Sequence, residues 1–275
     1  MSVTATDRLV DGYDLVILDL DGVVFLIDRP IPGAVETVSR LRADGVPVMF
    51  ATNNASRRAG EVADLLTGMG VAARAGEVLT SAGAAAATLA QRFEPGSPIL
   101  VVGADALREE VLDAGLRVVT SADDSPVAVV QGYGPQVGWA QLAEASLAIR
   151  AGALWVATNT DRTLPSPRGP LPGNGSLVSV IATALDRRPD VVVGKPEPGL
   201  FETAARQAGA RRPLVVGDRM DTDIAGAGRA GMDSLLVLTG VSGRDEAARA
   251  EPHDRPTFIA EDLTGLFAAV PTADR

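Results

Sequence analysis

Two carboxylates, Asp19 and Asp21, follow the apolar segment Leu15–Leu18 and are followed at once by Gly22. An uninterrupted apolar run is typical of a strand buried in a parallel sheet, and ligands bind beyond the carboxyl ends of such strands. Side chains at positions i and i+2 of a strand point the same way, so both carboxylates can reach one metal ion or one phosphoryl group. Glycine allows the backbone to turn sharply there. The alternative is an acidic turn that merely ends a strand.

The cationic residues carry a second signal. The chain has 25 Lys and Arg residues, and the only lysine among them is Lys195, in the segment Gly194-Lys-Pro196. A compact ammonium suits the neutralisation of a phosphate where a planar guanidinium would not fit. The alternative is an accident of composition.

Polar residues also follow a second apolar segment, residues 46–51. Thr52, Asn53 and Asn54 supply a hydroxyl and two amides that suit phosphate oxygens. For Thr52 and Asn54, a plain capping turn is the alternative.

A third polar group follows residues 213–217. Asp218, Asp221 and Asp223 crowd around the start of a predicted helix, where they repel one another unless a cation lies among them. We assign Asp218 to the metal and Asp223 to a supporting position, with Asp221 facing solvent.

Composition excludes several classes of chemistry and partner. The absence of cysteine excludes disulfides, thiolate catalysis and cysteine-bound metals, and the single histidine, His253, argues against histidine metal clusters. A net charge of -10 argues against nucleic acid or an anionic membrane as a partner. No apolar run approaches the ~20 residues that cross a bilayer, and the polar first residues are no secretory signal. A cytoplasmic location is the default expectation.

The elements that must position these residues alternate along the chain, as in consecutive βαβ units. Strands are expected over residues 14–20, 46–51, 99–102, 127–130, 153–157, 190–193, 213–217 and 234–238. Helices are expected over residues 33–44, 56–69, 81–93, 104–114, 139–150, 176–187, 197–209 and 222–230, with a Pro-rich loop over 158–175. The pattern predicts an α/β fold with a doubly wound, Rossmann-like parallel sheet.

The polar strand ends are not evenly distributed. They cluster in residues 1–79 and 188–275, whereas residues 80–187 contain no cluster of catalytic residue types. At 275 residues the chain is long enough for two domains that each bury a core. We therefore predict a catalytic core over 1–79 and 188–275 and an inserted α/β domain over 80–187. The alternative is one continuous sheet whose middle strands take no part.

The order of these features resembles the haloacid dehalogenase superfamily over nearly the whole chain. The matching segments are Asp19-Leu-Asp21-Gly-Val, Thr52-Asn-Asn54, Lys195, and Gly217-Asp218 to Asp223. Val23 departs from the pattern, because threonine is usual there. The position of the insertion, between Asn54 and Lys195, further resembles the NagD-like subfamily of p-nitrophenyl, phosphoglycolate, pyridoxal and glycerol 3-phosphate phosphatases.

The resemblance implies a magnesium-dependent phosphatase. Asp19 would attack phosphorus and form an aspartyl-phosphate, while Asp21 would protonate the leaving alcohol and then activate water. Mg²⁺ would be held by Asp19, the backbone carbonyl of Asp21, and Asp218. Asp223 would orient Lys195 or a metal-bound water.

The same resemblance implies how the substrate is bound. Thr52, Asn53, Asn54 and Lys195 would hold the transferring group, and the inserted domain would be a cap whose Asp161 and Arg162 touch the leaving group. A simple surface pair is the alternative for these last two. Dimerisation through the cap is implied by the resemblance alone.

We therefore expect hydrolysis of a small phosphorylated metabolite, with glycerol 3-phosphate or 2-phosphoglycolate as the leading substrates. Pyridoxal phosphate, sugar phosphates and nucleotides are alternatives within the same fold. A receiver-type signalling switch, which also uses an acid pair, a phosphorylated Asp, a Thr and a Lys, is the alternative from another class.

Overall fold

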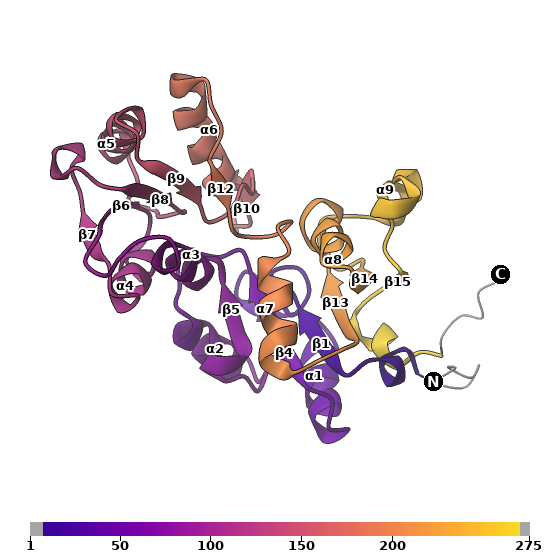
Figure 1. The fold of residues 1–275 in the computed structure, drawn as a ribbon. Helices are drawn as coiled ribbons and strands as arrows, with labels where there is room; N and C mark the ends of the chain where they lie inside the picture. Colours follow the sequence, from indigo (N-terminus) through magenta and orange to yellow (C-terminus); the bar gives the residue numbers. More distant parts are fainter. Residues whose placement is uncertain (1–7, 270–275) are drawn as a thin grey trace. The chain divides into compact units, whose positions relative to one another are not determined.

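The computed structural model describes residues 8–269, which form two compact α/β units (Figure 1). The first unit comprises the described residues up to Ala51, residues 63–78, and the described residues from Pro196 onward. The second unit comprises residues 52–62 and 79–195. The predicted fold class, α/β with parallel sheets, is confirmed. No helix in the described part of the chain is long and apolar enough to cross a membrane.

The first unit is built on a six-stranded sheet with the order β15-β14-β13-β1-β4-β5. Its central strand β1 is buried at all of its residues and pairs in parallel with β13 and β4, so that Leu18 lies opposite Val216 and Phe50. The carboxyl ends of β1 and β13 therefore lie side by side. The strands are β1 (Leu15–Leu18), β4 (Val48–Thr52), β5 (Val78–Thr80), β13 (Pro213–Gly217), β14 (Asp233–Val237) and β15 (Phe258–Ala260).

The helices associated with this sheet are short and follow its strands. They are α1 (Ala34–Ala43), α2 (Ala59–Gly68), α7 (Gly199–Ala208), α8 (Ala225–Arg229) and α9 (Arg244–Arg249). A π-helical turn, η4 (Met220–Ile224), leads from β13 into α8. The chain passes between the two units before the last residue of β4, within α2, within β5, and between Lys195 and Pro196.

The second unit is a five-stranded sheet with the order β12-β9-β8-β6-β7, covered by helices on both faces (Figure 1). Alternate residues of one strand face opposite helix layers: Ile99 and Val101 pack in the cluster of α3 and α4, whereas Leu100 and Val102 pack in that of α5 and α6. This two-sided burial explains why its strands read as continuous apolar runs. The elements are α3 (Ser81–Ala90), β6 (Pro98–Val102), α4 (Asp105–Asp113), β7 (Arg117–Val119), β8 (Ala128–Gln131), α5 (Trp139–Arg150), β9 (Leu154–Ala157), α6 (Asn174–Leu185) and β12 (Val191–Val192).

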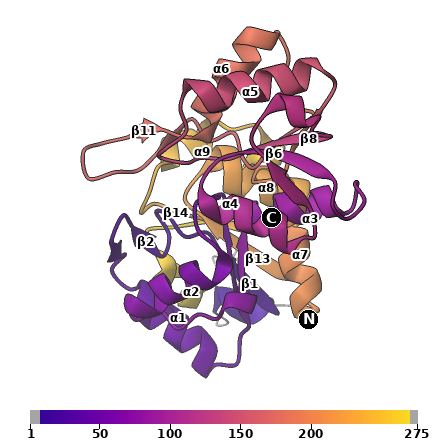
Figure 2. The ribbon, with the colours of Figure 1, turned by 90° about the vertical axis from the view of Figure 1, so that its left-hand side faces the viewer.

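Several short elements differ from the sequence prediction. The Pro-rich segment is not a plain loop, because it contains the antiparallel hairpin of β10 (Thr163–Leu164) and β11 (Leu171–Pro172), which Figure 2 shows extending away from the five-stranded sheet. A second hairpin, β2 (Phe25–Leu26) and β3 (Arg29–Pro30), follows the first acidic pair. β5, β7 and β15 also have no counterpart among the strands expected from the sequence. Strands of two or three residues are too short to show a hydrophobic period.

Candidate active site

Three buried carboxylates come together in the first unit. Asp19, Asp218 and Asp223 each offer an oxygen, and these oxygens all lie within 4.8 Å of one another. Asp19 follows β1 and Asp218 follows β13, so the parallel pairing of these strands brings them to one edge. The three residues are only 7%, 1% and 1% exposed.

A cluster of this kind favours a cation. Like charges out of water repel strongly, and a cation among them removes the repulsion. Carboxylate oxygens are the ligands that Mg²⁺ takes in proteins, usually together with water and substrate phosphates. The side chains present therefore fit a magnesium ion.

Asp218 is fixed by the segment that follows β14. The backbone N–H of Val241 donates to Asp218 Oδ2 at 2.8 Å, and the N–H of Ser242 donates to the Asp218 carbonyl at 2.9 Å. Two glycines make room for the carboxylate: a Cβ added at Gly22 would lie 2.6 Å from Asp218 Oδ2, and one at Gly240 would lie 1.9 Å from it. The segment from Gly240 to Ser242 therefore supports this carboxylate through its backbone.

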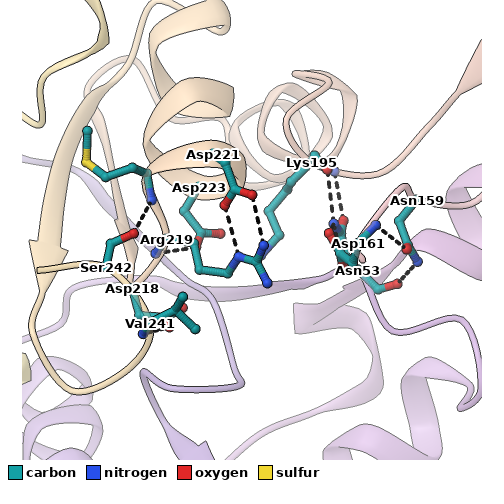
Figure 3. Close-up of polar contacts among 11 residues, drawn as sticks. Asn53, Asn159, Asp161, Lys195, Asp218, Arg219, Asp221, Asp223, Val241 and Ser242 are labelled. Atoms are coloured by element: carbon teal, nitrogen blue, oxygen red, sulfur yellow. Dashed lines mark hydrogen bonds and ion pairs between the residues drawn. The ribbon is translucent and has the colours of Figure 1, made fainter. Parts of the chain in front are cut away.

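Asp223 is brought to the cluster by the π-helical turn. The N–H of Arg219 donates to Asp223 Oδ2 at 3.2 Å, and a Cβ on Gly217 would lie 2.1 Å from that of Asp223. Asp221, in the same turn, is exposed and pairs with the Arg219 guanidinium at 2.9 Å (Figure 3). Asp223, to which the sequence assigned a supporting position, therefore presents an oxygen beside the other two.

Asp21 lies in the tight turn after β1 and is half-buried. The carbonyl of Leu20 accepts hydrogen bonds from the N–H groups of Val23, Val24 and Phe25 at 2.9–3.3 Å, and Gly22 donates to the carbonyl of Phe25 at 2.8 Å. Gly22 has a φ of +85°, which explains the glycine after the acidic pair. The Asp21 carboxylate is not part of the three-carboxylate cluster.

Thr52 and Asn54 form a local turn at the end of β4. Thr52 is buried, and its Oγ1 accepts a hydrogen bond from the N–H of Asn54 at 3.1 Å. Asn54 Oδ1 accepts from the N–H and the hydroxyl of Ser56 at 2.7 and 2.8 Å. These contacts close a local turn ahead of α2, so the Asn54 side chain stabilises the loop that carries Thr52.

Asn53 connects two segments of the second unit that are distant in sequence. Its Oδ1 accepts the N–H of Lys195 at 2.7 Å, and its Nδ2 donates to the Lys195 carbonyl at 3.0 Å. The same Nδ2 donates to the carboxylate of Asp161 at 3.1 and 3.2 Å (Figure 3). Within the second unit, Asn53, Asp161 and the buried Lys195 therefore lie together.

Arg162 lies next to this group but is exposed. Its carbonyl accepts from the N–H of Gly173 at 2.9 Å and from the hydroxyl of Ser176 at 2.7 Å, which fastens the β10–β11 hairpin to the start of α6. No sequence signal identified Asn159, whose Nδ2 donates to the Asn53 carbonyl at 2.7 Å and whose Oδ1 accepts the Asp161 N–H at 3.1 Å. Its position two residues after the end of β9 could have identified it.

Six of the sequence-predicted residues thus form two groups, each within one unit. Asp19, Asp218 and Asp223 belong to the first unit, and Asn53, Asp161 and Lys195 to the second. That both groups act on one phosphoryl group stays a prediction.

Two family profiles match the chain. Residues 16–117 match the family described as haloacid dehalogenase-like hydrolase, and residues 192–266 match one described as HAD-hydrolase-like. The matched ranges include Asp19, Thr52, Lys195 and Asp218.

Curated relatives match over nearly the full chain. A D-glycerol 3-phosphate phosphatase of Mycobacterium tuberculosis is 51% identical over 94% of this chain and 72% of its own length. A 5'-nucleotidase of Bacillus subtilis is 37% identical over 92% of this chain and 96% of its own.

Solved structures have the same fold. The structure of a glycerol phosphate phosphatase from Mycobacterium tuberculosis in complex with magnesium covers 95% of this chain and 78% of that chain, with 49% identity and a TM-score of 0.91. A 4-nitrophenylphosphatase from Thermotoga maritima covers 94% and 98%, with 32% identity and a TM-score of 0.86.

Proposed function

Because the chain belongs to the haloacid dehalogenase-like hydrolase family, we propose that it is a magnesium-dependent phosphomonoester hydrolase that acts on a small phosphorylated metabolite. The observation that carries the proposal is the buried group of Asp19, Asp218 and Asp223. Family membership favours this hydrolase over the receiver-type switch. The 51% identity to a D-glycerol 3-phosphate phosphatase supports glycerol 3-phosphate as the substrate, ahead of 2-phosphoglycolate.

The proposed reaction has two steps. A carboxylate oxygen of Asp19 attacks phosphorus, the bond from phosphorus to the alcohol oxygen breaks, and Asp21 gives its proton to that oxygen. Asp21 then takes a proton from water, the water oxygen attacks phosphorus, and the bond to Asp19 breaks to release phosphate. Thr52 and Lys195 bind the phosphoryl oxygens, with Lys195 neutralising their charge.

Asp19 and Asp218, with the carbonyl of Asp21, would hold the magnesium ion, and Asp223 would support the cluster. Bound magnesium neutralises the phosphoryl charge and that of the carboxylates. Asp161 and Arg162 are proposed contacts of the leaving group. A cap formed by residues 80–187, a homodimer through that cap and a cytoplasmic location stay predictions.

The test is a phosphate-release panel with and without magnesium. It contains glycerol 3-phosphate, 2-phosphoglycolate, pyridoxal phosphate, a hexose phosphate, a nucleoside monophosphate and p-nitrophenyl phosphate. Asp19→Asn is expected to abolish release, and Asp21→Asn is expected to retain a phosphoryl group on the peptide that contains Asp19, detected by mass spectrometry. Asp221→Asn is the matched control, because it removes an exposed carboxylate from the same turn as Asp223. Failure of the wild-type chain to hydrolyse any compound of the panel would refute the proposal.

A further inference from the structure

The amide of Asn53 is occupied by protein groups at both of its ends. Oδ1 accepts the Lys195 N–H at 2.7 Å, and Nδ2 donates to the Lys195 carbonyl at 3.0 Å. The Asn53 side chain thus binds both the backbone N–H and the backbone carbonyl of Lys195. Nδ2 also reaches Asp161 at 3.1 Å, so the two donor hydrogens have acceptors in the protein.

The backbone of Asn53 is fixed as well. Its carbonyl accepts hydrogen bonds from Ser81 Oγ at 2.6 Å and from Asn159 Nδ2 at 2.7 Å. Ser81 is fully buried and Asn159 is 4% exposed, so water does not compete freely for these bonds. Ser81 and Asn159 therefore fix the backbone of Asn53, while its side chain binds the backbone of Lys195.

Gly194 allows this close approach. A Cβ at residue 194 would lie 2.5 Å from Asn53 Oδ1 and 2.5 Å from the Thr158 carbonyl oxygen. Distances this short do not occur for real Cβ atoms, so any other residue would displace the Asn53 amide. Gly194 and Asn53 are therefore complementary in shape around the backbone of the lysine that follows.

We propose that Asn53 is a positioning residue for Lys195, and that its amide does not itself bind the phosphate. This role rests on the proposed function and is indirect, because Asn53 fixes the backbone from which the chain's only ammonium side chain extends. A buried lysine whose backbone shifts moves its ammonium relative to the phosphoryl group. A misplacement of ~1 Å can reduce a rate by about 100-fold.

The single lysine provides a direct measurement of this contact. A chain labelled with ¹⁵N-lysine gives one backbone amide signal, that of Lys195. Because this N–H is buried and bonded to Asn53 Oδ1, its hydrogen exchange is expected to be slow in the wild type. Asn53→Ala is expected to accelerate the exchange by about fivefold or more, whereas Asn53→Asp, which retains the acceptor oxygen, is expected to preserve it better.

A matched control separates this contact from general loosening of the second unit. Thr88→Ala removes a hydroxyl that donates to the Ala84 carbonyl at 2.8 Å within α3. It removes one side-chain hydrogen bond of the same unit without touching Asn53. We expect the exchange of Lys195 to be unchanged in this variant.

The kinetic test is a double-mutant cycle with Lys195→Ala, because a residue that acts through Lys195 loses its effect when the ammonium is absent. Asn53→Ala is expected to lower kcat for p-nitrophenyl phosphate by about 100-fold in the wild type and by less than about threefold in the Lys195→Ala background. A fall of equal size in both backgrounds would overturn the inference, since Asn53 would then act independently of Lys195.

A second readout uses the contact between Asn53 and Asp161. Asn53→Asp places two carboxylates in contact, and a shared proton relieves their repulsion. The activity of this variant relative to wild type is therefore expected to rise as pH falls, and adding Asp161→Asn, which restores a donor, is expected to remove that pH dependence. If the wild-type chain is active but Asn53→Ala leaves the hydrogen exchange of the Lys195 amide unchanged, the positioning role alone is refuted. A wild-type chain without activity would refute the proposed function and the positioning role together.

Discussion

Gly22 lies where the turn after β1 passes the Asp218 carboxylate, and Gly22→Ala tests whether that contact sets metal binding. A Cβ at this position would lie 2.6 Å from Asp218 Oδ2 and 2.7 Å from its Cγ. Alanine at a φ of +85° costs ~1–2 kcal/mol in backbone strain. The enforced contact adds about 1–3 kcal/mol, the usual cost of overpacking.

Gly45→Ala is the matched control. Gly45 has a φ of +74°, and nothing lies within 4 Å of an added Cβ, so this variant carries the backbone strain alone. Both variants are expected to lose ~1–2 kcal/mol of unfolding free energy from strain. Only Gly22→Ala displaces the carboxylate. Magnesium binding must return the displaced Asp218 carboxylate to its place against the added Cβ, at a cost of ~1–3 kcal/mol. This cost corresponds to a weakening of magnesium activation by about 5- to 150-fold.

The assay is phosphate release at a fixed substrate concentration as magnesium is titrated, together with calorimetric titration of magnesium into the free protein. The activation midpoint of Gly22→Ala is expected to rise, and that of Gly45→Ala to equal the wild-type value. If the two variants have the same midpoint, the contact between residue 22 and Asp218 does not control the metal site, and the reasoning is wrong.

Three further predictions concern the lysine, a strained turn and an ion pair. Lys195→Arg is expected to lower kcat by about 100-fold because a planar head displaces the phosphoryl group; a kcat near the wild-type value would contradict the argument from the lone lysine. Ile27 has a φ of 62°, which is unfavourable for a β-branched residue. Ile27→Asn is therefore expected to raise the unfolding free energy by about 0.5–1 kcal/mol. A denaturation midpoint below that of the wild type would show that the turn is not strained. Two hydrogen bonds from Arg42, at 3.0 and 2.7 Å, lower the pKa of Glu77 below its usual 4.5. The ionised Glu77 therefore stabilises the folded state above that pH, and this stabilisation is lost as pH falls through the folded-state pKa. Glu77→Gln is expected to lower stability at pH 7 by about 0.5–1 kcal/mol and to reduce its fall between pH 5 and 3; an unchanged acid profile in denaturation curves would refute this.

The fold class could be predicted because its strands are buried on both faces. Segments such as Leu15–Leu18 and Pro213–Gly217 read as apolar runs that end in acids, and parallel pairing then brings those acids to one edge. The hairpin of β10 and β11 could not be predicted, because its strands of two residues pair through backbone groups that leave no periodic trace. The same holds for the hairpin that contains Ile27.

The site shows a second limit of the sequence. Residue type indicated which side chains could bind a phosphate, but it could not indicate whether a given amide faces a ligand or another part of the chain. Asn53 and Asn54 are adjacent and identical in type, yet one binds the backbone of Lys195 and the other closes a local turn. Lys195 is distant from Asn53 in sequence, and the Asn53 amide can approach its backbone only because Gly194 has no side chain. A polar residue indicates which group could bind a ligand. The glycine before the lone lysine instead indicates a place where another side chain must approach the backbone closely.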